Sequence, residues 1–249
     1  MTGKLTKSQA KYIKSLQQKK YRDLHGKFIV EGIKLVQEAL KYPKLVDFVV
    51  YIDEIQDYNF EFPEQSFNTS PKELSMISSL KTPNKILAVC NKVAVQDKVN
   101  YRKPIVALDE ISDPGNLGTI IRLADWFGIS QIVCAPGSVD EYNPKVVQAT
   151  MGSIFNVDII TEELTKLVED APPDNQVCMA DMKGDNLYEM EIRDPFILIM
   201  GSESHGVSDE MRRLAKNVVS IPQFGGGESL NVAVSTAIIL SEFKRKLSS

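Results

Sequence analysis

Three polar segments in the second half of the chain carry side chains that could bind a ligand and act on it. The first, residues 113–122, has a Pro-Gly turn followed by Asn116 and Arg122. Six residues are close to two helical turns, so both side chains can face the same side of one helix. Asn116 is also a candidate N-cap for that helix. The plainer explanation for Arg122 is an arginine that reaches solvent from a helix otherwise buried in the core.

The second segment, residues 201–208, follows the most apolar run of the chain, residues 196–200. Gly201 permits a sharp turn and a close approach of a ligand to the backbone. Glu203 follows as either a site carboxylate or a solvated loop residue. For His205 we favour a loop position without a role.

The third segment, residues 221–231, has three consecutive glycines before a helix start at Ser229-Leu230-Asn231. Such a loop could cradle a phosphate, but it lacks the Lys-Ser/Thr ending of a nucleotide-hydrolase loop. It also does not follow the first strand, as a dinucleotide-binding loop does. The alternative is a flexible turn with Ser229 as the N-cap. Residues 232–240 carry no charge, which predicts a helix buried against the sheet or another subunit.

Short apolar strands alternate with amphipathic helices from residue 105 onward. This order predicts an α/β fold with a mostly parallel sheet covered on both faces. Ligands of such sheets bind beyond the carboxyl ends of the strands, which is where the three segments fall. The expected strands are 105–108, 131–135, 176–180, 196–200 and 218–221, and the expected helices are 117–127, 145–149, 161–168, 209–215 and 230–246.

A smaller α/β unit is predicted before the polar stretch 96–103, which we interpret as a linker between domains 1–98 and 104–249. Helical spacing of apolar residues and a capping-box pattern at Ser70-Pro71-Lys72-Glu73 predict its helices. The expected helices are 6–18, 33–40 and one beginning at Ser70, and the expected strands are 27–32, 45–52 and 85–95.

The charge of the chain is unevenly distributed. The net charge is −4, but residues 1–44 hold 11 Lys and Arg against 3 Asp and Glu, a local charge of +8. Charge alone leaves two explanations open, a phosphate-binding surface or a solvated, lysine-rich helix face.

The apolar runs, the N-terminal segment and the cysteines of the sequence also predict the cellular compartment of the protein. No apolar run reaches the length of a membrane span, and the Lys-rich start lacks a secretory signal core. Cys90, Cys134 and Cys178 each lie in an apolar, strand-like run without zinc-type spacing, which predicts buried thiols in a cytoplasmic protein without a metal site.

Taken together and in this order, the three segments resemble the three motifs of the SpoU/TrmH family, a branch of the SPOUT class of RNA 2′-O-ribose methyltransferases. The similarity covers about residues 104–246. Residues 27–32 with Glu38-Ala39 also resemble the small substrate-binding domain, similar to RNA-binding ribosomal proteins, that precedes the catalytic domain in many members. The matching residues are Asn116-Leu117-Gly118 with Arg122, Leu198–Glu203 with Gly206, and Ile221-Pro222 with Glu228–Ser235.

The resemblance implies a C-terminal trefoil knot, a homodimer that uses the last helix, and bound S-adenosylmethionine. The expected cofactor contacts, made mainly by backbone groups, are Met200, Gly201, Ile221, Ser229 and Leu230. Methyl transfer from a sulfonium needs no metal, because the leaving group departs neutral.

The resemblance also places Arg122 beside the target ribose. Arginine stays protonated under nearly all conditions, so we expect Arg122 to position the 2′-hydroxyl and the adjacent phosphate rather than act as a base. The residues expected to hold Arg122 and the ribose are Asn116, Glu203, Ser229 and Asn231. Gln148 departs from the family, which often has a basic residue at that place.

The sequence leaves four functions open. An rRNA ribose methyltransferase is preferred over a tRNA ribose methyltransferase, because the added N-terminal domain is commoner among rRNA-type members. RNA contacts are then expected chiefly from residues 4–44, since the rest of the chain is acidic. A third alternative is an RNA-binding protein that keeps the fold without turnover. A nucleotide-dependent oxidoreductase is disfavoured, because no glycine fingerprint follows the first strand of either domain.

Overall fold

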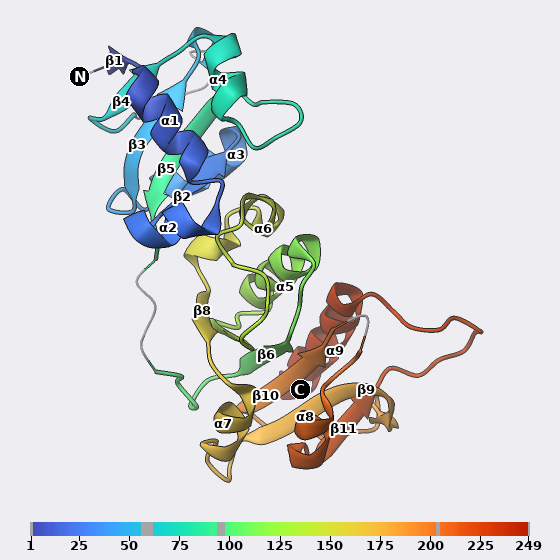
Figure 1. The fold of residues 1–249 in the computed structure, drawn as a ribbon. Helices are drawn as coiled ribbons and strands as arrows, with labels where there is room; N and C mark the ends of the chain where they lie inside the picture. The colour runs from blue at the N-terminus through green and yellow to red at the C-terminus, as the bar shows by residue number, and fades with distance from the viewer. Residues whose placement is uncertain (1, 56–61, 94–97, 203–204, 249) are drawn as a thin grey trace. The chain divides into compact units, whose positions relative to one another are not determined.

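The computed structural model describes residues 2–55, 62–93, 98–202 and 205–248 (Figure 1). The chain forms two compact units. The N-terminal unit is Met1–Ala94 with Asp140–Phe155, and the C-terminal unit is Val95–Val139 with Asn156–Ser249. Residues 140–155 thus pack with the N-terminal unit. No helix among the described residues is long and apolar enough to cross a membrane.

The sheet of the N-terminal unit has five strands. In spatial order they are β1 (Thr2–Lys4), β4 (Ser66–Asn68), β3 (Val46–Tyr51), β5 (Ile86–Asn91) and β2 (Lys27–Glu31). β4 runs parallel to β1 and β3, whereas β5 is antiparallel to β3 and β2. The predictions for β2, β3 and β5 are confirmed. Sequence analysis missed β1 and β4, because three residues are too few to show a strand period.

Helices cover both faces of this sheet. α1 (Lys7–Ser15) is capped by the Thr6 hydroxyl, which accepts a hydrogen bond from the Gln9 amide at 3.2 Å, and α4 (Pro71–Ile77) is capped by Ser70 in the same way. Ile13 and Leu74 from these helices pack on one face. α2 (Lys19–His25), which sequence analysis did not predict, α3 (Ile33–Leu40) and α6 (Pro144–Thr150) pack against β2. The short 3-10 helices are Asp53–Ile55 and Ser153–Phe155.

A buried ion pair ties residues 140–155 to the N-terminal unit. The Arg22 guanidinium pairs with the Asp140 carboxylate and also donates to the Leu16 and Gln17 carbonyl oxygens at 3.0 and 2.8 Å. The Arg22 and Asp140 side chains are only 3% and 8% exposed. Removing one partner of such a pair typically costs about 3–5 kcal/mol, because it leaves a buried charge without compensation. The Tyr142 ring adds a contact with Phe28 at 4.6 Å between centroids.

The C-terminal unit contains a six-stranded sheet in which every paired strand is parallel, which confirms the expected mostly parallel α/β fold. Sequence analysis missed β8 and started the following helix too early, at residue 161, because the two glutamates at 162 and 163 blur the boundary between strand and helix. In spatial order the strands are β11 (Asn217–Ser220), β9 (Gln176–Asn186), β10 (Phe196–Gly201), β6 (Ile105–Asp109), β7 (Gln131–Cys134) and β8 (Asp158–Thr161).

Two pairs of helices cover this sheet. α5 (Pro114–Trp126) packs against α9 (Val232–Leu247), whose Phe243 meets Phe196 of β10 edge-on at 5.1 Å. α7 (Leu164–Glu169) and α8 (Asp209–Leu214) pack together on the opposite face. The trefoil knot concerns the path of residues 201–231, two of which lie outside the described residues, and it stays a prediction.

Candidate functional site

A cavity of about 930 Å³ lies at the carboxyl ends of β10 and β11 and beside residues 180–183 in the middle of β9. This volume is within the range of about 300–1,000 Å³ that small-molecule sites occupy. The position also agrees with the rule that parallel sheets bind ligands beyond the carboxyl ends of their strands. Its lining residues are Ala180, Asp181, Met182, Lys183, Met200, Gly201, Ser202, Gly206, Arg212, Val219, Ile221–Gly225, Gly227–Leu230, Val232, Ser235 and Ile239.

A closed turn after β10 forms one wall of the cavity. The Ser202 amide donates to the Gly206 carbonyl oxygen at 3.0 Å, and the Gly206 amide donates back to the Ser202 carbonyl oxygen at 2.8 Å. A Cβ on Gly201 would stand 2.1 Å from the Gly206 carbonyl carbon, so only glycine fits. Glu203, a predicted catalytic residue, lies outside the described residues.

All five predicted cofactor contacts line this cavity: Met200, Gly201, Ile221, Ser229 and Leu230. Met200 is buried, whereas Leu230 is 52% exposed. The glycine run 225–227 is sterically open, since no atom lies within 4 Å of a Cβ built on any of these three glycines. The packing of this chain therefore does not require glycine there, unlike at Gly201.

Asn116 and Asn231 link the start of α5 to the start of α9. Asn231 Nδ2 donates to Asn116 Oδ1 at 2.9 Å. Two predicted caps are wrong. Asp113, not Asn116, caps α5 by accepting from the Asn116 amide at 2.8 Å, because the Pro-Gly pair already lies inside the helix. Asn231, not Ser229, caps α9 by accepting from the Ala233 and Val234 amides.

Arg122 lies on the exposed side of α5 and is not among the residues that line the cavity. Within the described part of the chain, its guanidinium makes no hydrogen bond or ion pair. Of the predicted catalytic residues, the structure thus brings Asn116 and Asn231 together and places Ser229 on the cavity wall, while Arg122 stands apart with its donors available.

Sequence analysis missed a group of charged residues on the cavity wall, namely Asp181, Lys183 and Arg212. Arg212 Nη1 lies 2.6 Å from Asp181 Oδ2, although 31 positions separate the two residues. The only local signal was Gly184, which follows a polar break in an apolar strand. A glycine at such a place indicates a bulge or a close backbone approach.

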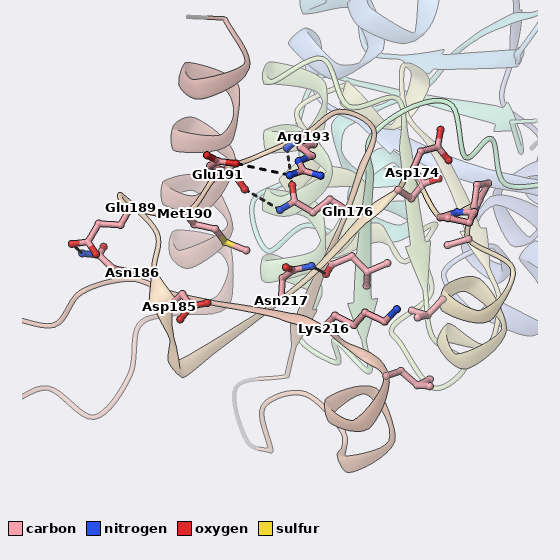
Figure 2. A pocket seen from close by; sticks show the side chains of 17 residues that line it. Asp174, Gln176, Asp185, Asn186, Glu189, Met190, Glu191, Arg193, Lys216 and Asn217 are labelled. Carbon is pink, nitrogen blue, oxygen red and sulfur yellow. Dashed lines mark hydrogen bonds and ion pairs between the residues drawn. The ribbon is translucent and has the colours of Figure 1, made fainter.

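A second cavity, of about 730 Å³, has Gln176 and Asn217, the first residues of β9 and β11, on its wall (Figure 2). Its polar groups are largely paired with one another. Gln176 Oε1 accepts from the Arg193 amide at 2.7 Å, and Gln176 Nε2 donates to the Glu191 carbonyl oxygen at 2.9 Å. These contacts hold the starts of β9 and β11 together, and Asp185 and Asn186, the last residues of β9, also line this cavity.

Cysteine chemistry does not contribute to the site. Cys90, Cys134 and Cys178 are buried in strands. Burial raises the pKa of the Cys178 thiol to about 12 and that of Cys90 further, so both stay protonated at neutral pH. Among the described residues, no three His, Cys, Asp or Glu side chains are grouped to hold a metal ion.

The model of the SpoU rRNA Methylase family matches residues 103–241, and that of the MRM3-like substrate binding domain matches residues 7–88. The first match alone spans more than half of the chain. The chain therefore belongs to the SpoU rRNA methylase family.

Individual relatives agree with this assignment. The chain is 32% identical to the 23S rRNA (guanosine(2553)-2′-O)-methyltransferase RlmP of Bacillus subtilis, over 91% of this chain and 92% of that protein. A putative RNA methyltransferase of the TrmH family from Porphyromonas gingivalis superposes with a TM-score of 0.88 at 34% identity, covering 97% and 99% of the two chains. An AdoMet-bound rRNA methyltransferase from Sinorhizobium meliloti gives 0.83 at 31% identity, covering 100% and 98%.

Replacing glycine by alanine should destabilise the closed turn after β10 but not the open glycine run 225–227. Gly201→Ala should lower the melting temperature by several degrees, because the new Cβ must displace the Gly206 backbone. Gly226→Ala is the matched control and should change the melting temperature by less than about one degree. Calorimetry of both variants tests this, and equal melting temperatures for the two would contradict the closed turn.

Proposed function

We propose that this protein transfers a methyl group from S-adenosylmethionine to a ribose 2′-hydroxyl of rRNA. The observation that carries the proposal is the cavity at the carboxyl edge of the parallel sheet. Residues from the second and third motifs line it, and a hydrogen bond joins Asn116 of the first motif to Asn231 of the third. The solved Sinorhizobium meliloti relative, which is AdoMet-bound, supports the choice of cofactor.

The cavity fits the cofactor in shape and polarity. Met200, Ile221 and Leu230 offer apolar surface for an adenine ring, and nearby backbone N–H and C=O groups can read its polar edge. Gly201 keeps the backbone free of a side chain at the turn. Charged side chains on the wall suit the amino-acid arm of the cofactor.

The cofactor supplies an activated methyl group on a positively charged sulfur. The side chains of this chain then need only to align the acceptor hydroxyl and exclude water. Arg122 keeps its charge and can hold the phosphate beside the target ribose. The Asn116–Asn231 hydrogen bond fixes the start of α5 relative to the start of α9. We propose Ser229, and Glu203 by family resemblance, as further contacts of the ribose.

Ribosomal RNA is the favoured substrate class. The Bacillus subtilis relative acts on 23S rRNA by its name, and its similarity extends over both units of this chain. The match of residues 7–88 to a substrate-binding domain model supports an RNA-binding domain within 1–98 and a catalytic domain within 104–249, of which residues 140–155 pack with the first domain. Both the RNA substrate and the protonated buried thiols fit a cytoplasmic enzyme.

We also propose that the protein is a homodimer that pairs through α5 and α9. The side chains of Trp126 and Val234 are 81% and 48% exposed. Two helices that pack against each other thus present apolar side chains to solvent, as expected of a surface that binds another protein. Arg122 precedes Trp126 by one turn on the same side of α5, so a second copy against this face would also contact Arg122.

A dimer predicts a mass in solution twice the chain mass of 27.8 kDa. Val234→Glu should shift sedimentation to the monomer, because it places an unpaired charge in the interface. Met76→Glu is the control, since Met76 is 54% exposed on α4 and lies outside the proposed interface. A wild-type monomer at micromolar concentration would refute the dimer.

Arg122→Ala should reduce methylation by about 100-fold or more, since a small loss of substrate alignment has effects of this size. Calorimetric binding of S-adenosylmethionine should change by less than about threefold, because Arg122 does not line the cavity. Arg102→Ala, an exposed arginine of the same unit, is the control. Activity is read by mapping 2′-O-methylated riboses across total RNA with and without the protein, which also separates rRNA from tRNA. If Arg122→Ala keeps its activity, the role proposed for Arg122 is wrong. If the wild-type protein does not bind S-adenosylmethionine, the proposed methyltransferase function is wrong.

Lys7, Lys11 and Lys14 are exposed along one side of α1 and are the proposed RNA contacts. Changing all three to Gln should weaken RNA binding and flatten the slope of log K against log salt by about 2, since each phosphate contact contributes roughly 0.7–0.9. Cofactor affinity should not change. The matched control changes Arg102, Lys103 and Lys166, three exposed cations of the C-terminal unit, to Gln. An equal effect of both triple variants would point to non-specific attraction.

A further inference from the structure

An ion pair between Asp181 and Arg212 forms part of the wall of the proposed cofactor cavity. Neither residue belongs to the three motifs. Their side chains come from different elements, an interruption in β9 and the helix α8. The inference that follows rests on the proposed function, because it concerns how the same cavity recognises one arm of its ligand.

The interruption in β9 is a bulge that shifts the register between β9 and β11. The register with β11 is Met179 opposite Val218, and then Asp185 opposite Val219, so the intervening residues leave the ladder. The ladder resumes at Asp185, directly after Gly184, where a Cβ would stand 2.6 Å from the Val218 carbonyl oxygen. The bulge directs Asp181 to the cavity wall, and the Lys183 amide donates to Asp181 Oδ1 at 2.9 Å.

Arg212 is held in place from the other side. Its Nε donates to the Val207 carbonyl oxygen at 3.1 Å, and its Nη1 lies 2.6 Å from Asp181 Oδ2. Nη2 would lie 3.3 Å from a Cβ on Gly206, so the guanidinium lies beside the closed turn after β10. Arg212 thus connects the bulge of β9 with the turn that carries Gly201.

The surroundings of the pair favour charged hydrogen bonds. The Asp181 side chain is 15% exposed and that of Arg212 is 38% exposed. Burial alone would raise the pKa of Asp181, but the Lys183 amide and the Arg212 guanidinium outweigh it and lower the pKa below its usual value. Asp181 is therefore a carboxylate at neutral pH, and partial removal from water strengthens its contacts.

The α-amino acid arm of S-adenosylmethionine has the complementary pattern. It carries a carboxylate and an ammonium on the same carbon atom, whereas the adenosine arm carries no charge. A neighbouring cation and anion on one wall can bind both groups at once. We propose that Arg212 binds the α-carboxylate and Asp181 binds the α-ammonium of the cofactor, so that this pair selects ligands with the intact amino-acid arm.

Truncating the ligand tests the proposal. Isothermal titration measures the dissociation constants of S-adenosylhomocysteine, which has the arm, and 5′-methylthioadenosine, which lacks it. Arg212→Gln should weaken S-adenosylhomocysteine by about 10-fold or more, the usual loss for a hydrogen bond to a charged group. The affinity for 5′-methylthioadenosine should stay within about twofold, because the adenosine contacts remain.

Three further variants sharpen the test. Arg212→Lys keeps a cation and should recover part of the lost affinity, and Asp181→Asn should weaken S-adenosylhomocysteine selectively, as Arg212→Gln does. Arg213→Gln is the matched control, since Arg213 is the next residue of α8, is exposed and does not line the cavity. It should leave both affinities unchanged.

The outcomes separate this inference from the proposed function. An equal loss for both ligands in Arg212→Gln would show that Arg212 only supports the cavity wall, and no loss for either would show that it is irrelevant; each overturns the inference alone. A wild-type protein that binds neither ligand overturns the proposed function together with it.

Discussion

The parallel alignment of β10 between β6 and β9 is the constraint on which the rest of the C-terminal unit depends. Gly201 stands opposite Asp109 in this register, so β10 and β6 end together at one edge of the sheet. Asp109 then accepts a hydrogen bond from the Ser208 amide at 2.8 Å and fixes where the turn after β10 ends and α8 begins. Because each loop at that edge starts from a buried strand, segments distant in sequence are brought close together there.

Local sequence patterns predict much of this architecture. The sequence predicts the caps at Thr6 and Ser70 and apolar strands such as β10, because these features depend only on residues a few positions apart. The missed features have other causes. The strands β1 and β4 are too short to be periodic, and the caps of α5 and α9 depended on which of several polar residues came last before the helix. The Asp181–Arg212 pair depends on a register shift in the ladder, which no local pattern reveals.

Glycines serve two different purposes at the site. At Gly201 and Gly184 a Cβ would overlap backbone atoms of the same chain, so the fold itself requires glycine at these two positions. A Cβ built on any glycine of the run 225–227 would meet no described atom of the chain within 4 Å, so the packing of the chain does not require glycine there. Fixing glycines costs more backbone entropy than fixing other residues, and two contacts hold this loop, because Gln223 Nε2 donates to the Gly225 and Gly227 carbonyl oxygens.

The Arg22–Asp140 pair bears on how the two units can be recombined. Residues 140–155 fall within the span of the methylase model, yet they pack with the unit matched by the substrate-binding model. The chain therefore crosses between the units three times, and a cut near residue 96 does not release two complete bodies. A chimera that exchanges substrate specificity between relatives has to carry residues 140–155 along with residues 1–94. Otherwise one parent's buried arginine faces whatever the other parent holds at position 140.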